Sequence, residues 1–194
     1  MKRLVLAFVL MVAMTMTSSA KKPDTASLKE ATAWIGRQMK VTGDPALAIA
    51  VVKDGRIILE QGFGLADTKK QTKATEHTLF SLASISKPIT ATGIMLLDQR
   101  GKLEIDRSAN GYLGEAKIRA KVGDAADVSV NNLLNHSSGI GLHYHFYYQD
   151  DGYAIPSRDD TIRHYGIAVS KPGSGYKYCN LGYGILDYLI SRHS

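Results

Sequence analysis

The stretch FSLASISKPITATGIMLLDQRG, residues 80–101, combines serines, one lysine and an apolar helical pattern. Ile89, Gly93 and the Leu96–Leu97 pair recur at helical intervals, which predicts a helix with one apolar face. The glycine directly after Arg100 is a typical helix end. A proline is tolerated only near a helix start, so Pro88 predicts that the helix begins close to this point. The helix therefore starts where the serines and the lysine lie.

Ser84 and Lys87 are the pair in this stretch that is separated by three positions. Residues i and i+3 share a helix face, so this spacing brings the lysine amine to the serine hydroxyl. A serine becomes a nucleophile when a neighbouring group takes its proton, and a helix N-terminus favours developing negative charge. The alternative interpretation is a helix-capping serine. Two further Ser-x-x-Lys matches, in residues 19–22 and 174–177, fall in a leader-like segment and in a glycine-rich turn.

A second candidate group lies near the end of the chain, in the stretch YKYCN, residues 176–180. Tyr178 and Asn180 form a Tyr-x-Asn motif. A tyrosine beside a lysine can relay a proton to a leaving group. An asparagine amide can donate to a substrate carbonyl and accept from its N–H group. The alternative for Tyr178 is a half-buried tyrosine whose hydroxyl is bonded within the protein.

The remaining pattern predicts a mixture of helices and antiparallel strands. Residues 27–40 are expected to form a helix, and residues 46–52 and 56–64 two strands. The Lys-Asp-Gly turn between the strands suits a tight hairpin. The apolar run 46–52 predicts a strand covered on both faces, and residues 68–78 a polar connection. A short helix is expected behind Ser129, and a last helix at the C-terminal end.

The N-terminus indicates an exported protein. A short basic region precedes an apolar run from Leu4 to Met14, and small residues at Ser18 and Ala20 suit a signal peptidase. We expect residues 1–20 to be a signal peptide, which implies a periplasmic or extracellular location. The alternative is an uncleaved anchor. No stretch is long enough to remain as a stable membrane span, which needs about 20 apolar residues. The single cysteine, Cys179, cannot form an internal disulfide and is expected to be a small core filler.

Composition argues against two classes of partner. The net charge of +6 is modest and spread along the 194 residues, without the basic, aromatic-interleaved stripe typical of nucleic-acid binding. His143 and His145 alternate in HYHFYY, so they are a possible pair of metal ligands, with His136 and His164 elsewhere. No third ligand has suitable spacing. We therefore expect no nucleic acid, no metal and no cofactor.

Three blocks together resemble the serine β-lactamase and penicillin-binding protein superfamily: residues 79–106, 130–141 and 172–190. A Tyr-x-Asn motif in place of Ser-x-Asn is similar to the class C branch, which also contains carboxypeptidases, aminopeptidases and esterases. The resemblance covers nearly all of residues 24–194. It implies an α+β fold of the β-lactamase/transpeptidase type, with an antiparallel sheet packed with helices plus a helical subdomain.

The resemblance also implies roles for the candidate residues. Ser84 would be the acylated nucleophile, and its backbone N–H would supply half of an oxyanion hole. Lys87 would activate it, Tyr178 would act as general base and then general acid, and Asn180 would orient the substrate amide. The implied substrate is a small molecule or a peptidoglycan-like group: a β-lactam, a D-Ala-D-Ala-type peptide or a small ester. The loop HSSG, residues 136–139, matches a family block without a chemical role.

The chain departs from the family after Asn180. The family has a Lys/His-x-Gly motif on a sheet-edge strand, and none occurs in the fourteen residues that follow Asn180. We therefore interpret residues 21–194 as the N-terminal portion of such a domain, without the C-terminal part of the sheet. Two functions stay open: a serine hydrolase acting through an acyl-enzyme, and a truncated, catalytically inactive protein or binding module.

Overall fold

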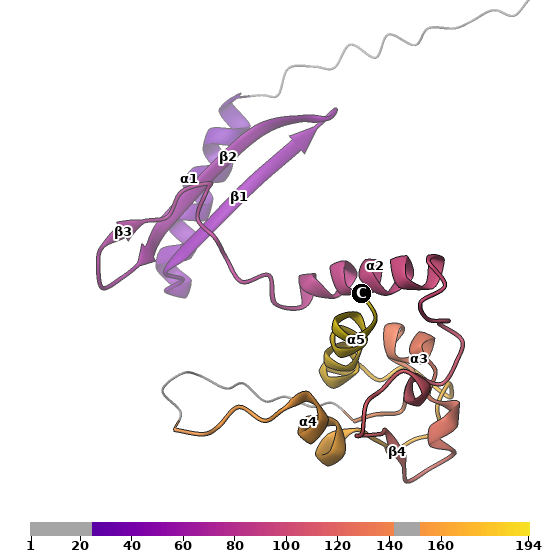
Figure 1. Ribbon diagram of the computed structural model, residues 1–194. Helices are drawn as coiled ribbons and strands as arrows, with labels where there is room; N and C mark the ends of the chain where they lie inside the picture. Colours follow the sequence, from indigo (N-terminus) through magenta and orange to yellow (C-terminus); the bar gives the residue numbers. More distant parts are fainter. Residues whose placement is uncertain (1–24, 142–151) are drawn as a thin grey trace, which may run out of the picture. The chain divides into compact units, whose positions relative to one another are not determined.

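The computed structural model describes residues 25–141 and 152–194 (Figure 1). The chain forms two compact units, of which the first ends at Ser81 and the second begins at Leu82. The expected signal peptide, residues 1–20, lies outside the described residues. Helices and antiparallel strands are both present, as the α+β prediction requires.

The first unit is a helix followed by a small antiparallel sheet. Helix α1 spans Thr25–Thr42, and the strands are β1 (Ala46–Lys53), β2 (Arg56–Asp67) and β3 (Thr72–Lys73). The sheet order is β1-β2-β3. Figure 1 shows α1 running along the β1–β2 hairpin. The predicted helix and two strands are confirmed, whereas the segment predicted as a connection contains the short strand β3.

Two backbone positions explain the shape of this sheet. Asp54 and Gly55 both have positive φ, 51° and 71°, as the tight hairpin turn requires. Gly64 also has a positive φ of 74°, and a Cβ atom there would collide with the carbonyl oxygen of Pro45. That carbonyl accepts the N–H of Leu65 at 2.7 Å. A glycine is therefore needed where β2 passes the start of β1.

The expectation that β1 is covered on both faces is wrong for its second half. Val51 is 37% exposed and Val52 63% exposed. Ala46 to Ile49 are only partly buried. An apolar run indicates a strand, but periodicity alone does not say what covers it.

The second unit contains most of the helices. Its longer elements are α2 (Ser86–Gln99), α4 (Arg158–Tyr165) and α5 (Asn180–His193). The shorter ones are the 3₁₀ turns η1 (Ala83–Ile85), η2 (Ala109–Gly111) and η3 (Ala125–Asp127), helix α3 (Val130–Leu134), and strands β4 (Arg119–Ala120) and β5 (Ile167–Ala168), which pair in parallel. Ser129 caps α3 and accepts the N–H of Asn132, as the predicted helix start requires.

Helix α5 lies at the centre of this unit. Its residues Ile185, Leu186 and Leu189 are fully buried. Helices α2, α3 and α4 all contact it. On α2 the buried residues are Ile94 and Leu97, while the expected core residue Ile89 is 65% exposed. At 3.6 residues per turn, Ile89 points about 140° away from Ile94, so the buried face is rotated around the helix axis from the predicted face.

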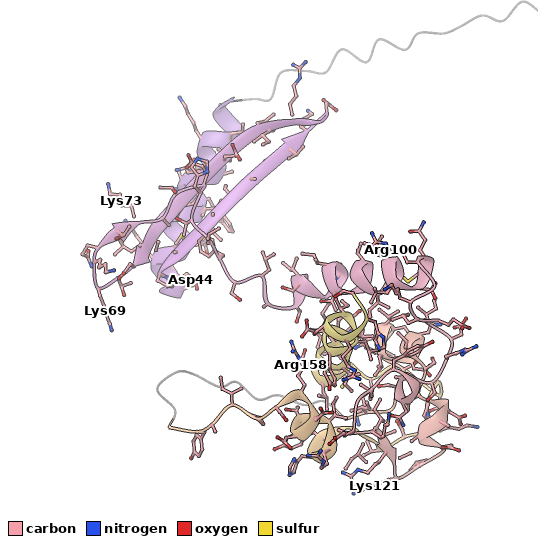
Figure 2. All side chains as sticks on the ribbon, viewed as in Figure 1. Asp44, Lys69, Lys73, Arg100, Lys121 and Arg158 are labelled. Atoms are coloured by element: carbon pink, nitrogen blue, oxygen red, sulfur yellow. The ribbon has the colours of Figure 1, made fainter. Side chains whose placement is uncertain are left out.

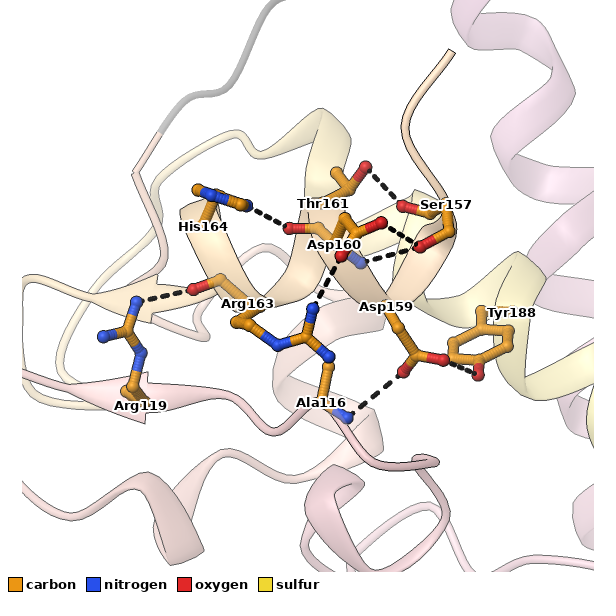
Figure 3. A network of polar contacts seen from close by, with 9 residues as sticks. All are labelled: Ala116, Arg119, Ser157, Asp159, Asp160, Thr161, Arg163, His164 and Tyr188. Carbon is orange, nitrogen blue, oxygen red and sulfur yellow. Dashed lines mark hydrogen bonds and ion pairs between the residues drawn. The ribbon is translucent and has the colours of Figure 1, made fainter. Parts of the chain in front are cut away.

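Helix α4 was not predicted, and polar contacts fix it in place (Figure 3). Ser157 caps its start by accepting the N–H of Asp160 at 3.0 Å. Asp159 accepts from the N–H of Ala116 at 3.2 Å and from the hydroxyl of Tyr188 at 2.9 Å. Because Tyr188 belongs to α5, this carboxylate joins α4, the segment before β4 and the central helix.

Charged side chains occur on many elements of both units. Figure 2 labels Lys69 and Lys73 at the β2–β3 end of the first unit, and Arg100, Lys121 and Arg158 on separate segments of the second. Arg158 forms an ion pair with Asp187 of α5 at 2.7 Å.

Among the described residues, no helix has the length and apolar character needed to cross a membrane.

Candidate active site

The first half of the site is the start of α2. Ser84 lies in the turn η1, and Lys87 is the second residue of α2. Pro88 follows within the first helical turn, as predicted. Ala83 has a positive φ of 46°. A non-glycine residue rarely adopts this conformation, which costs about 1–3 kcal/mol and is found preferentially at functional sites.

The second half is the segment that leads into α5. Cys179 is the N-cap residue of α5, and its Sγ accepts the N–H of Gly182 at 3.2 Å. Asn180 is the first residue of the helix, and Tyr178 lies two positions before it. The cysteine therefore does more than fill space. By capping α5, it fixes the backbone on which both candidate residues are placed.

The packing of α2 against α5 brings the four predicted side chains together. Lys87 Nζ lies 3.0 Å from Ser84 Oγ and 2.9 Å from Asn180 Oδ1. The Tyr178 hydroxyl lies 2.7 Å from the same Ser84 Oγ. Lys87 Nζ is also 4.8 Å from the centroid of the Tyr178 ring. The four side chains form one continuous hydrogen-bonded chain, from Tyr178 through Ser84 and Lys87 to Asn180.

Lys87 also fixes the orientation of the Asn180 amide. A lysine ammonium has only donors, so the atom that faces it must be the amide oxygen. The Nδ2 group, with its two N–H donors, therefore points to the other side. The sequence predicts that Asn180 both donates to a substrate and accepts from it. In the structure its oxygen already accepts from Lys87, and the donors remain for a substrate carbonyl.

The environment of Tyr178 stabilises its phenolate form relative to that of an ordinary tyrosine. Hydrogen bonding from Lys87, and next the bond with Ser84, lower the pKa of the Tyr178 hydroxyl below its ordinary value of 10.0; the Lys87 charge adds to the effect. A lowered pKa is what a general base needs near neutral pH.

The second Ser-x-x-Lys match, in residues 174–177, has a different hydrogen bond at its serine. Ser174 Oγ donates to the backbone carbonyl of Lys171.

Two further residues surround this chain and were not predicted as part of the site. His136 lies against the Tyr178 ring, with centroids 4.5 Å apart. Tyr183 faces Lys87, whose Nζ is 5.6 Å from its ring centroid, and its hydroxyl donates to the carbonyl of Leu134 at 2.8 Å. Burial raises the pKa of Tyr183, so its hydroxyl stays protonated and uncharged beside the site. His136 belongs to the HSSG loop, residues 136–139. The match of this loop to a family block was a feature of the sequence that pointed to His136.

Metal binding has no support within residues 25–141 and 152–194, where no group of three or more potential ligands occurs. His143 and His145, the pair proposed from the sequence, lie outside the described residues. His136 and His164 are engaged elsewhere: Nδ1 of His136 contacts the N–H of Cys179, and Nδ1 of His164 contacts the carbonyl of Asp160.

Comparison with known proteins assigns the family. The family described as Beta-lactamase matches residues 31–194. The chain belongs to this family. The expected superfamily of serine β-lactamases and penicillin-binding proteins is thereby confirmed. The matched range contains every residue of the site.

Relatives within the family carry several kinds of name. Esterase EstB of Burkholderia gladioli is 30% identical over 91% of this chain and 50% of its own length. Penicillin-binding protein 4* of Bacillus subtilis (strain 168) is 28% identical over 75% of this chain and 32% of its own length. The chain thus spans half or less of the length of these curated relatives.

Solved structures confirm the predicted β-lactamase/transpeptidase fold. The octameric penicillin-binding protein homologue from Pyrococcus abyssi matches with a TM-score of 0.71 and 27% identity, over 85% of this chain and 39% of that one. A class C β-lactamase matches with a TM-score of 0.66 and 26% identity, over 87% and 45%. The similarity extends across both units of the chain.

Proposed function

We propose that this chain carries the nucleophilic centre of a serine hydrolase that works through an acyl-enzyme on Ser84. The observation that carries the proposal is the hydrogen-bonded chain from Tyr178 through Ser84 and Lys87 to Asn180. It places a proton acceptor and a cation on the same serine oxygen. Ser84 itself is exposed and open to a substrate.

The first step is attack of Ser84 Oγ on the carbonyl carbon of an amide or ester. Tyr178 as phenolate takes the Ser84 proton while the new C–O bond forms. Lys87 donates to Ser84 Oγ and keeps the phenolate form accessible through its charge. The carbonyl π electrons move to its oxygen, and we expect the backbone N–H of Ser84 to be one donor to the negative charge there.

The second step expels the leaving group. The tetrahedral intermediate collapses, the bond to the amine or alkoxide breaks, and Tyr178 gives the proton it received to that leaving atom. The products are an acyl-Ser84 ester and a phenolate ready for the next cycle. A water molecule then attacks the ester by the same route, with Tyr178 first accepting and later returning a proton.

Asn180 and Lys87 position the reactants. The Nδ2 group of Asn180 is free to donate to a carbonyl next to the scissile bond, because Oδ1 is held by Lys87. Fixing both the substrate and the nucleophile is a large part of what such a site contributes to rate. The substrate class that fits is a small amide or ester: a β-lactam, a D-Ala-D-Ala-type peptide or a simple ester.

Covalent labelling tests this proposal directly. The full chain is incubated with a fluorescent fluorophosphonate and, separately, with a fluorescent penicillin. We expect at least one probe to label the wild type and Ser86→Ala, a matched change two positions away, and neither to label Ser84→Ala. Equal labelling of Ser84→Ala, or no labelling of the wild type by either probe, would contradict the acyl-enzyme.

The alternative is a ligand-binding module that does not turn substrate over. It predicts binding of a peptidoglycan-like ligand without release of product. Steady hydrolysis of nitrocefin or a p-nitrophenyl ester that Ser84→Ala abolishes would exclude this alternative. Saturable binding with no hydrolysis would support it.

We further propose that the chain is exported and processed after Ala20. The basic start and the apolar run of residues 4–14 support this. Sequencing the N-terminus of protein recovered from the periplasm or medium is expected to give Lys21 as the first residue. Recovery only from the cytosol, still beginning at Met1, would refute export.

A further inference from the structure

The ring of His136 lies among three tyrosine rings. Its centroid is 4.5 Å from that of Tyr178 and 5.1 Å from that of Tyr183, both in tilted packing. Tyr176 meets it edge-on at 5.6 Å. Such contacts limit the rotation of the Tyr178 ring against His136, whereas Tyr176 is 73% exposed. His136 is therefore a direct support for the ring of the proposed base.

Two hydrogen bonds also connect His136 to the backbone on both sides of Tyr178. Its carbonyl oxygen accepts the N–H of Lys177 at 2.7 Å. Its Nδ1 accepts the N–H of Cys179 at 3.1 Å. The residue before the tyrosine and the residue after it are thus held by one side chain and its own backbone. Tyr178 has little freedom to move away from Ser84 while both bonds persist.

The second of these bonds requires one form of the imidazole. A backbone N–H can only donate, so Nδ1 must be unprotonated and the ring proton must be on Nε2. The ring is therefore neutral in this arrangement. The groups around the imidazole are consistent with its neutral form. Lys87 on α2 carries a positive charge, which disfavours a second one on the ring, and the other neighbours are Tyr176, Tyr178 and Tyr183. Burial, and next the charge of Lys87, lower the pKa of His136 below its ordinary value of 6.5.

The backbone of His136 is also unusual, with a positive φ of 63°. Histidine and asparagine adopt this conformation more readily than most residues. The conformation turns both the carbonyl and the ring of His136 toward the segment before α5. An alternative residue must therefore meet two requirements, a positive φ and an acceptor near the Nδ1 position.

We propose that His136 is a positioning residue for Tyr178, which it holds on Ser84 mainly by accepting the Cys179 N–H at its unprotonated Nδ1, with ring packing against the phenol as the smaller contribution. The inference deepens the proposed function and rests on it, because it gives the base a fixed place in acylation. His136 itself does not touch the reacting atoms.

A pH dependence follows from this arrangement. Protonation puts a hydrogen on Nδ1, so the Cys179 N–H loses its acceptor and a second positive charge faces Lys87. Because the folded state disfavours the protonated ring, this occurs at a pH below 6.5. Acylation then falls for two reasons as the pH drops: Tyr178 is protonated, and its position is lost. The rate in this range is expected to depend on pH more steeply than one titrating group allows.

Two variants separate the acceptor from the ring. His136→Asn places an amide oxygen near the Nδ1 position and tolerates positive φ, but it has no aromatic ring and does not titrate. His136→Phe keeps the ring contacts and removes the acceptor. His164→Asn is the matched control, because His164 is an exposed histidine on α4 outside the site.

The first readout does not depend on turnover. Protein containing tyrosine labelled with ¹³C at Cζ is titrated by NMR, and the Tyr178 signal is assigned with Tyr178→Phe. In wild type, His164→Asn and His136→Asn, the pKa of Tyr178 is expected below 10.0. In His136→Phe it is expected to rise toward 10.0, because the phenol is no longer held at Lys87 and Ser84. An unchanged pKa of Tyr178 in His136→Phe would overturn the inference even if the enzyme is inactive.

The second readout is the acylation rate against pH. His136→Phe is expected to lose about 10- to 100-fold in kcat with KM little changed, the scale of a small misplacement of a reacting group. His136→Asn is expected to keep most of the rate at neutral pH and to show a shallower fall below pH 6.5. Equal losses in the two variants, or an equally steep acid limb in His136→Asn, would overturn the inference. Absence of acylation in the wild type would instead count against the proposed function alone, since the tyrosine titration still decides the role of His136.

Discussion

The hydroxyl of Tyr178 lies 2.7 Å from Oγ of Ser84, although the two residues are 94 positions apart in the chain. Their meeting depends on the packing of α2 against α5, since each residue lies just before one of these helices. The contact joins the proposed nucleophile to the proposed base, whose pKa is lowered by the neighbouring lysine.

Tyr178→Phe removes the phenolic oxygen and keeps the ring. We expect the acylation rate to fall by about 10²–10⁴-fold, the usual contribution of general acid–base catalysis. The stability of the fold should change little, because the ring contact with His136 remains. Stopped-flow acylation and urea unfolding measure the two effects. Tyr176→Phe, an exposed neighbour, serves as the control and should retain the wild-type rate.

Lys87→Met tests the origin of the lowered pKa of Tyr178. Lys87 is its largest cause, so the pKa of Tyr178 should rise toward 10.0 when the ammonium is removed. Less phenolate is then present at neutral pH, and the acid limb of any remaining activity moves to higher pH. Titration of Tyr178 by NMR measures the shift, with Lys177→Met as the control. The same pKa in Lys87→Met and wild type would show that Lys87 does not tune the base.

Local sequence patterns predicted part of this site. The i,i+3 spacing of Ser84 and Lys87 and the position of Pro88 were enough to place both residues at a helix start. No local pattern brings Tyr178 and Asn180 to that helix, and their roles came from the resemblance of three blocks to a family. The positive φ of Ala83 depends on tertiary packing and has no signature in residue types.

Helix α4 and the contact of His136 were not predicted from the sequence for similar physical reasons. Helix α4 carries start and end signals at Ser157 and Gly166, but it buries only Ile162, so it has almost no apolar periodicity. It is held by Asp159 and its polar partners on other elements (Figure 3). His136 was visible in the HSSG loop, yet its contact with Tyr178 is set by the long-range packing of that loop.

Gly139, in the same loop, is expected to be intolerant of any side chain. It has a positive φ of 74°, and a Cβ atom would collide with the backbone carbonyl oxygen of Ser170. Gly139→Ala should lower the free energy of unfolding by more than the about 1–3 kcal/mol of backbone strain alone. Gly111→Ala, where no atom lies within 4 Å of the added Cβ, should stay within about 0.5 kcal/mol of wild type. Urea unfolding of both variants measures this, and equal stabilities would contradict the predicted collision.

Cys179 offers a last test, because its sulfur caps α5 by accepting the N–H of Gly182. Cys179→Ser keeps an acceptor at this position, whereas Cys179→Ala leaves the N–H unpaired. We expect the alanine variant to be less stable than the serine variant by about 1 kcal/mol, the usual value of a helix cap. Burial raises the pKa of the wild-type thiol, so a thiol reagent at pH 8 should react with it only after unfolding. Equal stability of the two variants would show that the sulfur does not act as a cap. Rapid modification of the native protein would show that the thiol is not shielded.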